Sequence, residues 1–288
     1  MNVDVCNVTK RYDQDTVLDN VSFRLNGPQI YGLLGRNGAG KTTFMDIMAG
    51  NTLASSGNVL INGEEPFDNE GVNETICLIK ESNNFKRDLK IKEILRVFSF
   101  FYPNWDQPLA DQLIQEYQLK PHAKVKTLSK GMESALGIIV GLASKAPITI
   151  FDEPYIGLDA AARKNFYMKM LEEFENEKRM IIFSTHLIDE VSLMFHEVLI
   201  LQEGRLVLQE SAEVLRQRSC AVSGSVLDVE AFIKDKEVIE TKQLAGTMTA
   251  YIFGNIKEAK KQGFHVEGIP IQELMIHLTE KGKGASIK

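Results

Sequence analysis

The sequence predicts an α/β protein whose main sheet is parallel. Three stretches carry this prediction, because each of them reads as a short buried strand followed by a turn and a helix. The apolar strand segments are residues 30–34, 148–153 and 180–184. Since the carboxyl ends of parallel strands meet at one edge of a sheet, the polar residues that follow these segments are expected to lie together there.

Ahead of the first segment, alternating apolar residues predict two half-buried strands, around residues 3–8 and 21–25. Tyr12 lies between them. Its ring could stack on an adenine base, whereas an aromatic residue at such a place is more often packed at an edge of the fold. The sequence leaves both interpretations of Tyr12 open.

Residues 35–42 match the phosphate-binding pattern G-x-x-x-x-G-K-[ST]. Glycines let the backbone curl so that several N–H groups point at one anion, and the helix predicted at residues 41–50 turns its positive end toward the same point. Lys41 would reach the β- and γ-phosphates, and the Thr42 hydroxyl would hold Mg²⁺. The alternative is a glycine-rich surface turn without a ligand. The expected phosphate-binding residues are Gly35, Asn37, Gly38, Ala39, Gly40, Lys41, Thr42 and Thr43.

After this loop, residues 58–61 predict a strand that ends in the hairpin turn Asn62-Gly63, and residues 75–79 predict another short strand. Helices are expected at residues 91–102 and 109–117, a region rich in aromatic side chains. We expect most of these rings to form the core of a small helical subdomain, and a partner-binding surface is the alternative. The rings are Phe98, Phe100, Phe101, Tyr102 and Trp105.

Polar residues with possible roles in phosphate chemistry follow. Ser129 is placed to cap the helix predicted at residues 133–143, or to face a phosphate together with that helix end. Asp152 ends an apolar strand and can hold Mg²⁺, and Glu153 can orient or deprotonate a water molecule aimed at a γ-phosphate. His186 follows the strand at 180–184, where a histidine is usually structural but could contact the γ-phosphate from the same sheet edge.

Together these motifs resemble the nucleotide-binding subunit of ATP-binding-cassette (ABC) transporters over roughly residues 1–215. Residues 35–42 look like the Walker A loop, 148–153 like Walker B and 157–159 like the D-loop. Residues 128–132 are similar to the LSGGQ signature, which separates this family from other P-loop ATPases. The resemblance implies a P-loop NTPase sheet with an N-terminal antiparallel β subdomain and a helical subdomain at about residues 85–145. It also makes Glu153 the catalytic glutamate and His186 the switch histidine.

Two parts of the family pattern differ here. Lys130 and Met132 stand where the family has Gly and Gln, whereas Ser129 and Gly131 remain and are expected to contact phosphate. Glu81 falls where the family has the Q-loop glutamine; a carboxylate can still approach Mg²⁺, but its charge differs.

A finer likeness comes from residues 102–106 followed by 128–132, which resemble the YtrB type of bacterial exporter ATPase. That type includes subunits of antibiotic-resistance and amphipathic peptide-toxin exporters, such as the phenol-soluble modulin exporter. The likeness implies that the cargo is a peptide or a drug-like compound and that it is exported.

The resemblance implies ATP hydrolysis, with ATP and Mg²⁺, by a head-to-tail dimer. Each site would use Lys41, Thr42, Asp152, Glu153 and His186 of one chain with Ser129 and Gly131 of the other. The implied partners are an integral membrane permease subunit, contacted through residues 85–105, and a second ATPase subunit that is the same chain or a different one. Two alternatives stay open: a soluble ABC-type ATPase acting in repair, translation or cofactor assembly, and a regulatory cassette with little hydrolysis.

Composition limits the partners and the location. The net charge of −6 and the pI of about 5.5 favour no nucleic-acid partner. The first residues do not resemble a signal peptide, and the longest apolar runs are far shorter than the ~20 residues that span a bilayer. We therefore expect a cytoplasmic protein, peripheral to the inner face of the cell membrane. The three cysteines form no metal-binding pattern and are expected to be buried thiols.

The tail, residues 219–288, lies outside the core of the resemblance. We expect it to form a small α/β accessory domain, which would cover an edge of the main domain or help to hold two subunits together. Its predicted strands are residues 226–232, 237–241 and 247–253, and its predicted helices are residues 256–262 and 271–280.

Overall fold

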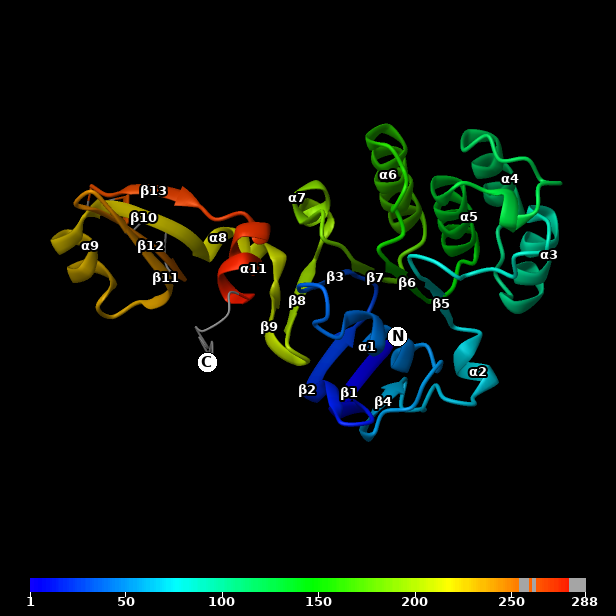
Figure 1. The fold of residues 1–288 in the computed structure, drawn as a ribbon, viewed down its shortest axis with the longest axis horizontal. Coiled ribbons are helices and arrows are strands. Elements are labelled where there is room, and N and C mark those ends of the chain that lie inside the picture. Colours follow the sequence, from blue (N-terminus) through cyan, green and yellow to red (C-terminus); the bar gives the residue numbers. More distant parts are fainter. Residues whose placement is uncertain (254–258, 261–262, 280–288) are drawn as a thin grey trace.

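The computed structural model describes residues 1–253, 259–260 and 263–279 (Figure 1). In these residues the strands form three sheets, one mostly parallel and two antiparallel. The first antiparallel sheet comes from the N-terminal part of the chain, and the second lies toward the C-terminus at the opposite end of the molecule from helices α3 and α4. The expected α/β fold is confirmed.

The largest sheet has the strand order β5-β6-β7-β3-β8-β9, with all neighbours parallel except β8 and β9. Every residue of β3, β6 and β7 is buried, as expected for parallel strands covered on both faces. These are the three predicted strands, and they are adjacent, so their carboxyl ends meet at one edge. The strands are β3 (Ile30–Leu34), β5 (Ile76–Ile79), β6 (Ile148–Asp152), β7 (Met180–Ser184), β8 (Glu197–Gln202) and β9 (Arg205–Ser211).

The N-terminal sheet has the order β2-β1-β4 and is antiparallel. Its apolar face shares one core with helix α1 and with one face of the large sheet, and this core includes Val21, Phe44 and Ile148. The predicted turn at Asn62-Gly63 is present, with positive φ at both residues. The elements are β1 (Asn2–Tyr12), β2 (Asp15–Asn26), β4 (Ser56–Ile61), α1 (Lys41–Met48) and the short α2 (Glu70–Asn73).

Helices α3 to α6 gather beside the other face of the large sheet, where they form a second core (Figure 1). The expectation that most of the five aromatic residues contribute to the core holds for three of them. Phe98, Tyr102 and Trp105 pack against this core, but Phe100 and Phe101 are 77% and 61% exposed. The elements are α3 (Ile91–Phe101), α4 (Gln107–Glu116), the 3-10 turn η1 (Val125–Thr127), α5 (Lys130–Ala143), α6 (Ala160–Asn176), α7 (Ile188–Val191) and η2 (Ser192–Met194).

The C-terminal sheet has the order β11-β12-β10-β13 and is antiparallel. The last helix of the described chain, α11, carries Leu274 and Leu278 into the core that also contains Ile188 of α7 and Leu215 of α8. The tail therefore packs against the large α/β part through α11. The elements are α8 (Ala212–Arg218), β10 (Ser219–Ser225), α9 (Val226–Ile233), β11 (Glu237–Leu244), β12 (Thr247–Phe253), β13 (His265–Gly268) and α11 (Ile271–Thr279).

Two expectations were wrong, one about a predicted strand and one about a cysteine. The strand predicted at residues 226–232 is helix α9, because the Ser225 side chain accepts a hydrogen bond from the backbone N–H of Asp228 and caps a helix. Its buried residues Val229 and Phe232 are three apart, which suits a helix and not a strand. Among the cysteines, Cys77 and Cys220 are buried, but Cys6 is exposed.

The helix predicted at residues 256–262 lies largely outside the described residues. Within the part of the chain that is described, no helix has the length and apolar character needed to cross a membrane.

Candidate functional site

The glycine-rich loop joins β3 to α1 at the carboxyl edge of the large sheet (Figure 1). Gly40, the residue before α1, has a φ of 99°, and a Cβ atom there would lie 2.8 Å from the carbonyl oxygen of Val17. Only glycine fits this position without strain. Since glycine has no side chain to cap the helix, the first N–H groups of α1 remain directed at whatever occupies the space in front of the loop.

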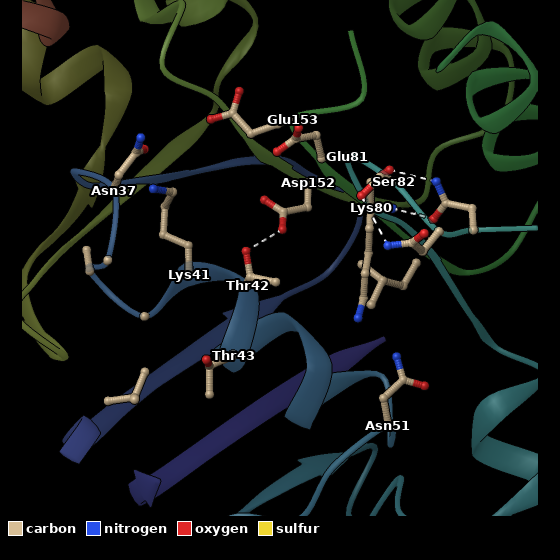
Figure 2. A pocket seen from close by; sticks show the side chains of 17 residues that line it. Asn37, Lys41, Thr42, Thr43, Asn51, Lys80, Glu81, Ser82, Asp152 and Glu153 are labelled. Carbon is tan, nitrogen blue, oxygen red and sulfur yellow. Dashed lines mark hydrogen bonds between the residues drawn. The ribbon is translucent and has the colours of Figure 1, made fainter. Parts of the chain in front are cut away.

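That space is a cavity of about 720 Å³ (Figure 2). Many of the predicted site residues line it together, although they come from distant parts of the sequence. The lining residues among those predicted are Asn37, Gly38, Ala39, Gly40, Lys41, Thr42, Thr43, Glu81, Asp152 and Glu153.

Two lysines line this cavity, Lys41 in the glycine-rich loop and Lys80, which pairs with Asp46. Lys41 Nζ donates hydrogen bonds to the carbonyl oxygens of Gly35, at 2.7 Å, and Arg36, at 3.3 Å. Burial lowers the pKa of Lys41, and the nearby carboxylates of Glu153 and Asp152 oppose this effect. A buried ammonium group is costly unless an anion accompanies it, so a phosphate in this cavity would relieve the desolvation of Lys41.

Thr42 and Asp152 form a pair of oxygen donors at the end of β6. Thr42 Oγ1 donates a 2.6 Å hydrogen bond to Asp152 Oδ2, and Figure 2 shows the pair facing the cavity. Hydroxyl and carboxylate oxygens are the ligands that Mg²⁺ prefers. Among the described residues no cluster of three or more His, Cys, Asp or Glu could hold a metal ion. A magnesium ion at this pair would therefore take further ligands from water and phosphate, as Mg²⁺ commonly does.

Glu153 and His186 are joined directly. His186 Nδ1 lies 2.8 Å from Glu153 Oε2, so the ends of β6 and β7 bring these two predicted residues together. Glu153 has a φ of 51°, an uncommon backbone conformation for a residue with a side chain. The hydroxyl of Tyr155 also donates a hydrogen bond to Glu153 Oε2. Sequence reasoning missed Tyr155, whose one signal was its place two residues after Glu153.

Glu81 and Lys130, two of the three residues that depart from the family pattern, contact each other. Lys130 Nζ donates a 2.6 Å hydrogen bond to the carbonyl oxygen of Glu81 and lies 3.7 Å from its Oε1. Glu81 lines the same cavity as Thr42 and Asp152 (Figure 2). No spacing rule relates residues this far apart in the chain, so the sequence alone did not indicate this contact.

Ser129 and Gly131 begin helix α5. Ser129 Oγ accepts a hydrogen bond from the backbone N–H of Met132, which caps α5 as expected, and the helix starts at Lys130. Gly131 lies against the turn that follows β6, where an added Cβ would be 2.3 Å from the carbonyl oxygen of Gly157. In the described chain neither Ser129 nor Gly131 lines the cavity.

Tyr12 is 48% exposed, and the Lys10 ammonium group lies 4.7 Å from the centre of its ring. The ring is therefore not packed into an edge of the fold, and stacking on adenine stays a prediction. Tyr12, Gly35 and His186 are not among the residues that line the cavity within the described chain.

Comparison with known proteins fits this geometry. The profile of the ABC transporter family matches residues 18–156. An ABC transporter ATP-binding protein of Methanocaldococcus jannaschii is 32% identical over 213 residues, which are 71% of this chain and 76% of that protein. The chain belongs to the family of ABC transporter ATP-binding proteins. Members of this family bind ATP, generally hydrolyse it, form dimers and work with a membrane permease.

Two further relatives are similar over most of the chain. The ABC transporter ATP-binding protein YtrB of Bacillus subtilis (strain 168) is 25% identical over 260 residues, 90% of this chain and 89% of YtrB. The likeness to the YtrB type is thereby confirmed. The Nod factor export ATP-binding protein I of Burkholderia pseudomallei (strain 1710b) is 29% identical over 219 residues, 74% of this chain and 72% of that protein.

Solved structures confirm the fold. A structure described as the ATP binding subunit of an ABC transporter has a TM-score of 0.67 at 25% identity, covering 75% of this chain and 92% of that one. The ATP-binding cassette MJ0796, described as a dimeric post-hydrolysis state bound to ADP and Pi, has a TM-score of 0.65 at 20% identity, covering 73% and 98%.

Proposed function

We propose that this chain is the ATP-hydrolysing subunit of an exporter, and that a separate membrane permease carries a peptide or a drug-like compound. The observation that carries the proposal is the convergence on one cavity of Lys41, the Thr42–Asp152 pair and Glu153. The names of the relatives support a transport role, because one of them is an export ATP-binding protein. The proposed boundaries are 1–215 for the ATPase domain, with a helical subdomain at about 85–145, and 219–288 for the accessory domain.

In the proposed reaction, water attacks the γ-phosphorus of ATP, the bond to the β–γ bridging oxygen breaks, and ADP and phosphate form. Lys41 and the loop amides bind the phosphates, with the whole run Gly35 to Thr43 as the binding loop. Glu153 orients the attacking water and accepts a proton from it, while His186 contacts the γ-phosphate. Tyr12 stacks on the adenine ring.

Magnesium fits the oxygen donors of this site. Thr42 and Asp152 would hold the ion, with Glu81 as a further carboxylate that lines the same cavity. When bound, Mg²⁺ neutralises charge on the phosphate oxygens.

The second half of each site would come from a second ATPase subunit, identical or different. Ser129 and Gly131 do not line the cavity of their own described chain, which supports a contact with ATP held by a partner. The N-terminal end of α5 would then offer its backbone N–H groups and the Ser129 hydroxyl to that phosphate. ATP binding would close such a dimer and hydrolysis would open it.

Contact with the permease would use the helical subdomain. Phe100 and Phe101 on α3 are largely exposed, and Val97 on the same helix is 41% exposed. Exposed apolar side chains grouped on one helix mark an interaction surface. The chain would thus sit in the cytoplasm, peripheral to the inner face of the membrane, without a nucleic-acid partner.

A phosphate-release assay with Glu153→Gln tests this proposal. The variant should bind ATP with affinity close to that of the wild-type chain, accumulate dimer and lose most of its turnover, at least about a hundredfold. Hydrolysis near the wild-type rate would contradict the role of Glu153. ATP binding without hydrolysis by the wild-type chain would instead support a regulatory cassette.

Purification of the chain from its native membrane tests the transport role. Co-purification of a multi-span membrane protein is expected, and identification of that protein would narrow the cargo. Recovery with ribosomal or DNA-repair components instead would support the soluble alternative.

A further inference from the structure

The hydroxyl group of Tyr155 lies at the centre of a hydrogen-bond network behind Glu153. Tyr155 is 2% exposed and follows β6, yet its oxygen lies 2.7 Å from Thr185 Oγ1 and 3.2 Å from the backbone nitrogen of His186, both at the end of β7. Its other partners are Glu153 Oε2 and, at 3.3 Å, Nδ1 of His186. One buried hydroxyl therefore ties together the ends of two neighbouring strands.

The directions of these hydrogen bonds follow from what each group can donate. An ionised carboxylate only accepts, so Tyr155 must give its one proton to Glu153. Thr185 accepts a 2.9 Å bond from the backbone N–H of Leu187 and can donate its own proton to the Tyr155 oxygen. The backbone N–H of His186 donates to the same oxygen, so every group in the network is satisfied.

The network also determines how Glu153 is held. His186 Nδ1 lies 2.8 Å from Glu153 Oε2, and because the carboxylate accepts, Nδ1 must carry the hydrogen. The described contacts of the Glu153 carboxylate thus involve Oε2, which leaves Oε1 to accept a hydrogen bond from water. Burial and the bond to Glu153 raise the pKa of Tyr155, so its hydroxyl keeps the proton that it donates.

We infer that Tyr155 is a positioning residue for hydrolysis: it fixes Oε2 of Glu153 and, through it, the tautomer of His186, so that Oε1 faces the attacking water. This inference rests on the proposed ATP hydrolysis and adds to it a residue that acts through Glu153 and His186 without touching the nucleotide. A misplaced carboxylate orients water poorly, so the loss should fall on turnover and not on nucleotide binding.

Tyr155→Phe removes the hydroxyl and keeps the ring, which stacks at 6.3 Å and 25° on Phe183. We expect kcat for ATP to fall about tenfold or more while KM changes less than about twofold. Tyr167→Phe is the matched control, because its ring lies 6.4 Å from that of Tyr155 but takes no part in the network. It should leave both constants near their wild-type values.

A second readout does not depend on turnover. ¹⁵N NMR of the imidazole nitrogens at about pH 8.5, where histidine is neutral, reports which nitrogen carries the hydrogen. Wild-type His186, assigned with His186→Gln, should be protonated at Nδ1, and Tyr155→Phe should lose this preference. If Tyr155→Phe does not fold, Thr185→Val replaces it, since this change removes the hydroxyl that donates to Tyr155 and should shift both readouts in the same direction.

The outcomes distinguish the role of Tyr155 from the proposed ATP hydrolysis. Turnover near the wild-type rate in Tyr155→Phe, or an unchanged His186 tautomer, would overturn the role of Tyr155. The same loss of turnover in Tyr167→Phe would also overturn it, because the effect would then be one of packing. A wild-type chain that releases no phosphate, while Tyr155→Phe still alters His186, would refute the proposed hydrolysis and leave the network intact.

Discussion

The Lys130 ammonium group lies 2.6 Å from the backbone carbonyl oxygen of Glu81 and 3.7 Å from its carboxylate. The contact joins the first turn of α5 to the loop after β5, and this loop lines the cavity. Both side chains are largely in water, with exposed fractions of 38% and 53%, so the pair adds at most about 1 kcal/mol to the free energy of unfolding. We expect the contact mainly to restrain the loop after β5.

Replacement of Lys130 by methionine should therefore loosen the loop without destabilising the fold. Hydrogen–deuterium exchange of the amides in residues 81–86 should become faster, because the loop loses its link to α5. The melting temperature should change by no more than about 3 °C. Lys120→Met, at an exposed position, is the control and should leave exchange in that loop unchanged. Equal exchange in both variants would show that the Lys130 contact does not restrain the loop.

Removal of the Thr42 hydroxyl should weaken nucleotide binding in a magnesium-dependent way. Thr42→Val loses the group that donates to Asp152, and loss of a metal-site partner typically costs about 10- to 100-fold in affinity. Titration with a fluorescent ATP analogue in the presence of Mg²⁺ should reveal this loss. The same titration in EDTA should show almost no difference between the variant and the wild-type chain, and an equal loss in EDTA would argue against a magnesium role for Thr42.

The pair Arg163–Glu190 predicts a pH-dependent contribution to stability. It connects α6 to α7, just after His186, through two hydrogen bonds of 2.9 and 3.1 Å. The Arg163 guanidinium lowers the pKa of Glu190 below its ordinary value of 4.5. Since the folded-state pKa is the lower one, the stabilisation is present above that ordinary value and is lost as the pH falls through the folded-state pKa.

Arg163→Met should thus lower the melting temperature at pH 7 by no more than about 3 °C, because the pair is partly exposed. The difference from the wild-type chain should shrink as the pH falls below about 4. Differential scanning fluorimetry across this range measures it. A gap that stays constant down to about pH 3 would mean that the effect of Arg163 is packing and not charge.

The C-terminal helix α11 should be a structural part of the folded chain. Leu274 is 0% exposed and packs in the core that contains residues of α7 and α8, so Leu274→Ala should lower the free energy of unfolding by about 2–5 kcal/mol. Leu244→Ala is the control, since Leu244 is 82% exposed and should change that free energy very little. Urea denaturation distinguishes the two, and similar midpoints for both variants would contradict the packing of α11.

The exposed rings on α3 should matter for assembly and not for chemistry. Phe100→Ser and Phe101→Ser, made together, should reduce the amount of permease that co-purifies with the chain, because they remove apolar surface. ATP binding by the isolated chain should stay unchanged. The control is Met168→Ser on α6, also 61% exposed. A double variant that retains the permease fully would place the contact elsewhere.

The features that the sequence predicted correctly are those whose cause is local. A run such as residues 180–184, apolar at nearly every position, must be buried on both faces. Gly40 directly before Lys41 is typical of a phosphate-binding loop. The segment at 226–232 was wrongly predicted to be a strand, because over so short a stretch its apolar residues fit the period of a strand as well as that of a helix. The Ser225 cap favours the helix.

Contacts between distant residues could not be predicted in this way. The bond of Tyr155 to Thr185 depends on β6 and β7 being neighbours and on a chain reversal after Glu153, and no pattern within either segment encodes that distance. The same holds for Lys130 and Glu81, each of which was noticed only as a departure from a family pattern.

Gly131 and Gly157 bring two backbones into direct contact, with room for no side chain on either: an added Cβ on Gly157 would lie 2.8 Å from the nitrogen of Gly131. Two backbones in direct contact resist compression, because no side chain lies between them that could change its conformation. A shift of the turn that follows Glu153 toward α5 would therefore displace the start of the helix as well. In the proposed dimer, where the start of α5 would contact the ATP of the other subunit, this contact would link the two sites mechanically.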